Sequence, residues 1–197
     1  EIEQISPSCM LHPNIYSAYN SGIQKINKNK NVTKLTNDTI KPEMNLPTHV
    51  VSSVSAKKFI EDKSLLKHPF YEMWSDGKLE LDSLKGYSKE YYQLVKQVPQ
   101  FMQPMVNDAS SDMKDELIQN MKEESEHIPL WEKFAGSMGI SESELQGYEG
   151  LEKTKRAVSN LGSLMDSFDN GACAMYAFEK EIPKVSQTKL EGLKEFY

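Results

Sequence analysis

The chain has 197 residues, of which 38% are hydrophobic and 26% charged, and its formal net charge is −6. This composition predicts one globular domain, and the excess of acidic residues argues against nucleic-acid binding, which needs clustered positive charge. No apolar run approaches the roughly 20 residues of a membrane span, and the first residues lack a signal-peptide pattern. We therefore expect a cytoplasmic protein without a membrane partner, with secretion into a host cell left open. Cys9 and Cys173 form no CxxC pair, which excludes a zinc ribbon and a disulfide scaffold.

The composition changes near residue 57. Residues 1–57 contain no Phe, Trp or Arg, whereas residues 58–197 hold both tryptophans and all seven phenylalanines. A segment with no Phe or Trp and many polar residues buries little apolar surface by itself. We predict a mostly irregular N-terminal extension over 1–57, followed by one helical domain over 58–197.

Apolar residues recur at helical spacing throughout 58–197, and no stretch alternates as a strand would. In chain order we predict long helices over 80–109 and 112–138, a helix that begins after Ser141, and a long helix over 154–182. Pro99 and Pro104 lie inside the first of these and predict a kink rather than two separate helices. The pattern as a whole predicts an all-α bundle.

One position breaks the apolar stripe of the 154–182 helix: Glu179. An ionised carboxylate inside a bundle is costly unless it is paired or bound to a metal. Pro183 follows four residues later and cannot donate the helical hydrogen bond to the Glu179 carbonyl, so the helix is weakened there. Periodicity alone does not decide whether Glu179 pairs with a lysine at the bundle rim or binds a metal ion.

The 112–138 helix carries a second group of polar residues. Glu123 and His127 lie four residues apart, and Glu124 and His127 form an ExxH, so each pair shares a helix face. A ferritin-like dimetal site uses the ExxH spacing, although a surface charge cluster gives the same pattern. Taken with Glu179, the group favours iron or manganese over structural zinc.

Three segments carry a resemblance to a known family: HPFYEMWSDGKLELDSLKGYSKEYY (68–92), EESEHIPLWEKFAGSMGISESEL (123–145) and AMYAFEKEIPKVSQTKLEGLKEFY (174–197). They resemble the CADD family of haem-oxygenase-like dimetal oxidases, which is related to the PqqC and TENA proteins. The resemblance covers almost all of 58–197 in order. It implies a seven-helix bundle holding two metal ions, usually iron, that activate dioxygen, and para-aminobenzoate, a folate precursor, as the product.

The resemblance also implies residue roles. Tyr71 matches the tyrosine thought to be consumed as the source of the product ring, and Lys189 matches the suspected amino donor. Tyr87 matches a further tyrosine that lines the pocket. The implied metal ligands are Glu123 (with Glu124 as the alternative), His127 and Glu179.

The sequence departs from the family in three places. The family spaces its Glu and His ligands by about seven positions, whereas Glu123 and His127 are four apart. Phe178 stands where the CADD group has a tyrosine. The final ligand module, HxxxDxxH, is absent before Tyr197. We therefore expect a bundle without its C-terminal helices in the chain as given, and a native chain that continues.

Other functions remain open at this stage. The family name records an association with death domains, so a module that binds a host or regulatory protein without turnover is one alternative. A PqqC-like oxidase of another small molecule is a second. A TENA-like hydrolase of thiamin fragments is a third, but Cys173 is not where its nucleophile is expected. For the assembled protein we predict a homodimer.

Overall fold

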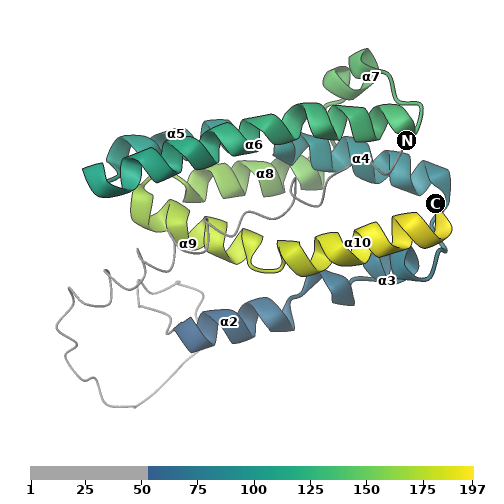
Figure 1. Cartoon of the computed structure of the whole chain (residues 1–197), viewed down its shortest axis with the longest axis horizontal. Helices are drawn as coiled ribbons and strands as arrows, with labels where there is room; N and C mark the ends of the chain where they lie inside the picture. The colour runs from purple at the N-terminus through teal and green to yellow at the C-terminus, as the bar shows by residue number, and fades with distance from the viewer. Residues whose placement is uncertain (1–52) are drawn as a thin grey trace.

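The computed structural model of the chain describes residues 53–197, which contain no strand (Figure 1). The elements are α2 (Ser53–Asp62), η3 (Leu65–Lys67), α3 (Pro69–Ser75), α4 (Leu81–Val95), α5 (Val98–Asp108), α6 (Ser111–Ser137), α7 (Glu142–Gly147), α8 (Glu152–Leu164), α9 (Phe168–Glu179) and α10 (Ile182–Phe196). The predicted all-α class is confirmed. Helix α2 crosses residue 57, and the rest of the predicted extension lies outside the described residues.

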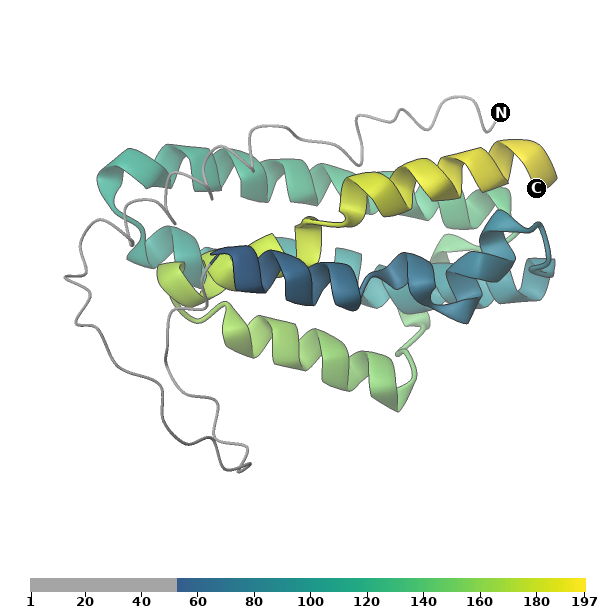
Figure 2. The same ribbon diagram turned by 90° about the horizontal axis from the view of Figure 1, so that it is seen from below.

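The bundle is built along α6, the longest helix of the described part. Helices α4 and α5 pack against α6, α9 packs against α5, and α8 packs against α4 and α9. Helix α10 packs against α3, and α8 lies on the side of the bundle away from α6 (Figure 2). Helices α3, α4, α6 and α10 thus surround one end of the molecule.

Buried apolar residues form three clusters. The first, between α5, α6 and α9, is rich in methionine and consists of Val98, Met102, Met105, Val106, Leu117, Met165, Ala172 and Met175. The second consists of Tyr92, Trp131, Ala135, Ile140 and Leu145, and the third of Trp74, Leu79 and Leu84. Tyr87 packs against both the second and the third cluster, so its ring lies where they meet.

The kinked helix predicted over 80–109 is wrong, because two helices occupy that range. Helix α4 ends at Val95, and Pro99 lies in the first turn of α5. In a continuous helix, residue 99 would donate to the carbonyl of Val95, and proline has no N–H to do so. A proline in the first turn of a new helix loses no bond, since that turn has no intrahelical acceptor. Pro104 is accommodated inside α5.

The single helix predicted over 154–182 is also wrong. Helix α8 ends at Leu164 and α9 begins at Phe168, whose backbone N–H donates to Asp108 Oδ2 at 2.9 Å. A carboxylate from the end of α5 therefore satisfies one of the free N–H groups at the start of α9, where negative charge is favourable. Helix α9 then ends at Glu179, as the weakening at Pro183 suggested.

Two sequence predictions for this region are confirmed. The helix expected over 112–138 is α6, which continues through Pro129. Ser141 caps α7, because its Oγ accepts a hydrogen bond from the Glu144 backbone N–H at 3.2 Å. Within residues 53–197, no helix has both the length and the apolar character that crossing a membrane requires.

Candidate active site

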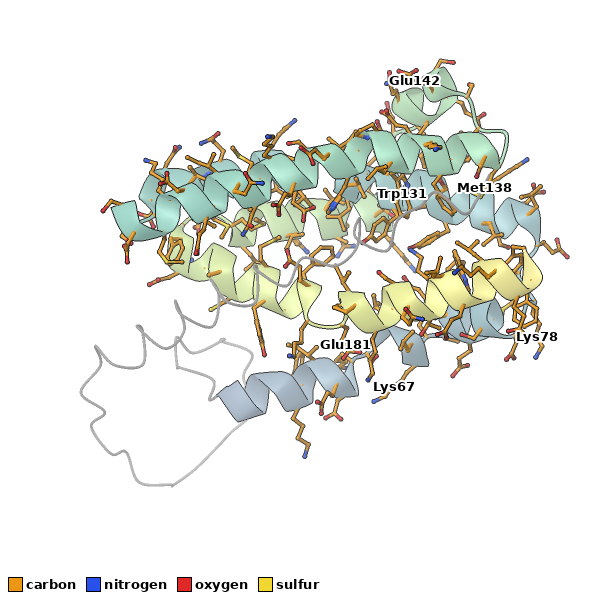
Figure 3. All side chains as sticks on the ribbon, viewed as in Figure 1. Lys67, Lys78, Trp131, Met138, Glu142 and Glu181 are labelled. Carbon is orange, nitrogen blue, oxygen red and sulfur yellow. The ribbon has the colours of Figure 1, made fainter. Side chains whose placement is uncertain are left out.

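Lys189 lies on the buried face of α10, at a helical spacing from Val185 and Gly192, and its side chain is only 6% exposed. Its Nζ faces four aromatic rings, with ring centroids at 5.0 Å (Tyr87), 5.2 Å (Trp131), 5.6 Å (Trp74) and 5.6 Å (Tyr91). Figure 3 shows Trp131 on the side of α6 that faces α10. Burial lowers the pKa of Lys189 to about 8, because the ammonium form is poorly solvated there.

Two backbone carbonyls fix the indole rings of this site. Trp74 Nε1 donates to the Lys189 carbonyl at 3.0 Å, and Trp131 Nε1 donates to the Ser88 carbonyl at 2.8 Å. Gly192 permits the close approach of α10 to α3, since a Cβ there would lie 2.6 Å from Trp74 Cδ1. Both tryptophan rings are therefore held by the backbone of neighbouring helices.

Tyr71 adjoins the lysine site through Tyr87. Tyr71 lies in the first turn of α3, which begins at Pro69. His68 caps this helix, because its Nδ1 accepts a hydrogen bond from the Phe70 N–H at 3.2 Å. The Tyr71 and Tyr87 rings are edge to face with centroids 6.5 Å apart. Burial raises the pKa of both phenols, so both stay protonated at neutral pH.

Two acidic residues and a histidine form a second group, and the charges of the two acidic residues, Glu124 and Glu179, act on Tyr91. His127 Nδ1 is 3.1 Å from Glu124 Oε2, as the ExxH spacing predicts. Burial lowers the pKa of His127, but the hydrogen bond and charge of Glu124 outweigh this and raise it overall. Burial, followed by the charge of Glu124, raises the pKa of Glu179 to about 8. The charge of Glu124 on α6 therefore acts on Glu179 on α9.

Tyr91 connects the two groups. Its ring stacks on Trp131 with centroids 4.7 Å apart and lies 5.6 Å from Tyr87. Burial raises its pKa, and the charges of Tyr71, Glu124 and Glu179 add to the increase. Tyr91 thus contacts the residues of the lysine site through its ring and is influenced by the charges of the acidic group.

The structure separates the two glutamates proposed as alternatives. Glu124 Oε2 lies 3.1 Å from His127 Nδ1, whereas Glu123 accepts a hydrogen bond from Gln119 Nε2 at 2.8 Å along α6 and acts on His127 through its charge. Within the described part of the chain, no three His, Cys, Asp or Glu side chains converge closely enough to hold a metal ion. Glu124 and His127 suit two positions of a metal site, but these side chains alone do not fit a dimetal centre. The ligand roles stay predictions.

Sequence reasoning missed three members of the site: Trp74, Tyr91 and Trp131. Helical spacing carries the signal for two of them. Tyr91 follows Tyr87 by four positions on α4, and Trp131 follows His127 by four on α6, so each shares a face with a predicted site residue. Trp74 could not be told from a core aromatic residue, because its role depends on how α3 meets α10.

The chain is similar to proteins of known classification. Residues 55–195 match the TENA/THI-4/PQQC family. A 4-aminobenzoate synthase of Chlamydia pneumoniae is 35% identical over 147 residues, which are 71% of this chain and 66% of that protein. The 4-aminobenzoate synthase of Chlamydia muridarum (strain MoPn / Nigg) is 33% identical over 70% of this chain and 61% of its own length. A 4-aminobenzoate synthase of Nitrosomonas europaea is 27% identical over 154 residues, 70% of this chain and 63% of its own. The chain thus spans less than two thirds of the length of these relatives.

Proposed function

Because the chain belongs to the TENA/THI-4/PQQC family, we propose that it is an oxidase that forms 4-aminobenzoate (para-aminobenzoate) from its own side chains. Tyr71 is the proposed source of the ring and Lys189 the proposed source of the amino nitrogen. The relatives named 4-aminobenzoate synthase support the product. The observation that carries the proposal is that the Tyr87 ring contacts both residues: it is edge to face with the Tyr71 ring, with centroids 6.5 Å apart, and its centroid lies 5.0 Å from Lys189 Nζ.

The protonation states suit these roles. With a pKa of about 8, roughly a tenth of the Lys189 side chains are neutral amines at pH 7, whereas an exposed lysine is almost entirely charged. Only the neutral amine has the lone pair needed to form a new bond to carbon. Tyr71 remains a phenol, because burial raises its pKa.

Iron, with manganese as the alternative metal, and dioxygen as co-substrate belong to the proposal through the family. In this proposal Glu124, His127 and Glu179 are the residues of this chain that would contribute ligands to the metal. No complete ligand set for such a metal converges within residues 58–197. The roles proposed for Tyr71 and Lys189 depend on the aromatic site, whose geometry the described residues define.

The experiment supplies the chain with ferrous iron, ascorbate and air and measures 4-aminobenzoate by liquid chromatography and mass spectrometry. Tyr71→Phe and Lys189→Met should each abolish the product, because the first removes the phenol oxygen that activates the ring for oxidation and for replacement by nitrogen, and the second removes the proposed nitrogen donor. Tyr148→Phe and Lys184→Ala are the matched controls, since Tyr148 bonds to Glu90 away from the site and Lys184 is exposed on α10. Undiminished product from Tyr71→Phe or from Lys189→Met would count against the proposal.

A further inference from the structure

We propose that Trp74, Tyr87, Tyr91 and Trp131 form an ammonium-binding cage, and that this cage binds a free primary alkylammonium ion when the side chain of Lys189 is shortened. The native occupant of the cage is the Lys189 ammonium group. The inference goes beyond the proposed function, because it concerns binding alone and needs neither a metal nor turnover.

The geometry of the four rings is that of a cation site. All four ring centroids lie within 5.0–5.6 Å of Lys189 Nζ, inside the roughly 6 Å over which a cation is attracted to an aromatic face. Three helices contribute the rings: α3, α4 and α6. Rings from three directions therefore meet around one nitrogen supplied by a fourth helix, α10.

The rings are the neighbours that stabilise this charge. Among the described residues, no carboxylate oxygen lies within 4 Å of Lys189 Nζ, although ion pairs of that length are found at Lys78, Lys89 and Lys155. A buried ammonium group without a partner is costly. The electron-rich ring faces offset part of that cost, since each attracts a desolvated cation.

The cage does not depend on the lysine side chain for its shape. The hydrogen bonds of Trp74 and Trp131 end on backbone carbonyl oxygens, at residue 189 and at Ser88, and both bonds survive replacement of the lysine side chain. Ring contacts between Trp74 and Tyr87, and between Tyr91 and Trp131, at 5.6 and 4.7 Å, connect the walls. Truncation should therefore leave a preformed site.

Lys189→Ala defines the ligand. The substitution removes three carbon atoms and the ammonium nitrogen, which are the heavy atoms of n-propylammonium. Propan-1-ol has the same length without the charge, so it measures filling of the cavity alone. The chain has only two tryptophans, Trp74 and Trp131, so its intrinsic tryptophan fluorescence reports on the cage and on nothing else.

The experiment titrates the Lys189→Ala chain with n-propylammonium chloride at pH 7 and constant ionic strength while tryptophan fluorescence is recorded. We expect a saturable change, with binding at least about tenfold tighter than that of propan-1-ol, because a tenfold ratio corresponds to about 1.4 kcal/mol and lies within the range of a desolvated cation–aromatic contact. Adding Trp131→Leu should remove most of this preference. Lys184→Ala, which leaves the cage occupied, should show no saturable change. Equal affinity for propan-1-ol, or saturation in Lys184→Ala, would overturn the proposal.

A second measurement uses the unaltered chain, so the test survives if Lys189→Ala does not fold. In a sample labelled with carbon-13 lysine, ring currents should move the Hε resonances of Lys189 upfield of those of the exposed lysines. Lys189→Arg assigns the signal, and Trp131→Leu should move it part of the way back. Hε resonances of Lys189 at the position of an exposed lysine would show that the rings do not enclose its ammonium group.

Discussion

Replacing Lys189 by methionine should change how the stability of the chain depends on pH. The folded state lowers the pKa of Lys189 from 10.5 to about 8, so between these values the unfolded chain binds more protons than the folded one. Stability contributed by this group is therefore smallest below pH 8 and rises as the pH increases toward 10.5. Between pH 7 and pH 10 the gain amounts to roughly 2–3 kcal/mol, since one pKa unit corresponds to 1.36 kcal/mol. Methionine has similar length but no charge, so the variant lacks this gain.

The assay is urea unfolding of the unaltered chain and of Lys189→Met at intervals from pH 7 to pH 10. The difference between the two free energies of unfolding isolates Lys189, because every other titrating group is common to both chains. The buried phenols of Tyr71, Tyr87 and Tyr91 have raised pKa values and cancel in the same way. The unaltered chain should gain on the variant as the pH rises. A constant difference would refute the burial argument, and a gain by the variant would show that the folded state raises the pKa of Lys189.

Three further substitutions, at Gly192, Glu90 and Glu179, are tested by thermal and urea unfolding. Gly192→Ala should destabilise the chain by about 1–3 kcal/mol, because the new Cβ would lie 2.6 Å from Trp74 Cδ1. The control Gly136→Ala should be neutral or stabilising, since a Cβ there meets nothing within 4 Å. Equal effects of the two substitutions would contradict the close approach of α10 to α3. Glu90→Ala should lower the free energy of unfolding by roughly 1–3 kcal/mol, because the Tyr148 hydroxyl and the Leu151 N–H both donate to this carboxylate. It should also speed amide exchange in the α7–α8 connection, and unchanged exchange there would show that Glu90 does not hold the connection in place. In chelator-treated protein, Glu179→Gln should be more stable than the unaltered chain at pH 9 but not at pH 5. The folded state raises the pKa of Glu179 from 4.5 to about 8, so the unaltered chain loses stability as the pH rises through that interval. A variant that is more stable at pH 5 than at pH 9, relative to the unaltered chain, would show that the folded state lowers this pKa.

The helical class could be predicted because apolar residues at helical spacing specify α-helices without knowledge of their neighbours. The break between α8 and α9 could not. Residues 165–167 contain neither glycine nor proline, and the start of α9 is satisfied by Asp108 from a distant helix. The break at residues 96–97 has a local signal in Pro99, but this signal is ambiguous, because proline causes a kink inside a helix and equally favours the first turn of a new helix.

The candidate site was predictable only in part, and for a related reason. Glu179 interrupts an apolar stripe, and Lys189 occupies a position that the spacing of Val185 and Gly192 places on the buried face of α10. The cage could not be predicted, because its rings come from three helices and meet only in the folded bundle. Homodimer formation and a protein partner stay predictions, since neither depends on the packing within one chain.

The central claim is that the chain supplies the atoms of 4-aminobenzoate from Tyr71 and Lys189. Isotope labelling tests it most directly. The chain is prepared with carbon-13 in its tyrosine rings and nitrogen-15 at the lysine ε position, and is supplied with unlabelled ferrous iron, ascorbate and air. We predict 4-aminobenzoate that carries both labels, together with a mass change confined to the peptides that contain Tyr71 and Lys189. Unlabelled 4-aminobenzoate, or labelled product from a chain whose Tyr71 peptide keeps its mass, would contradict the account.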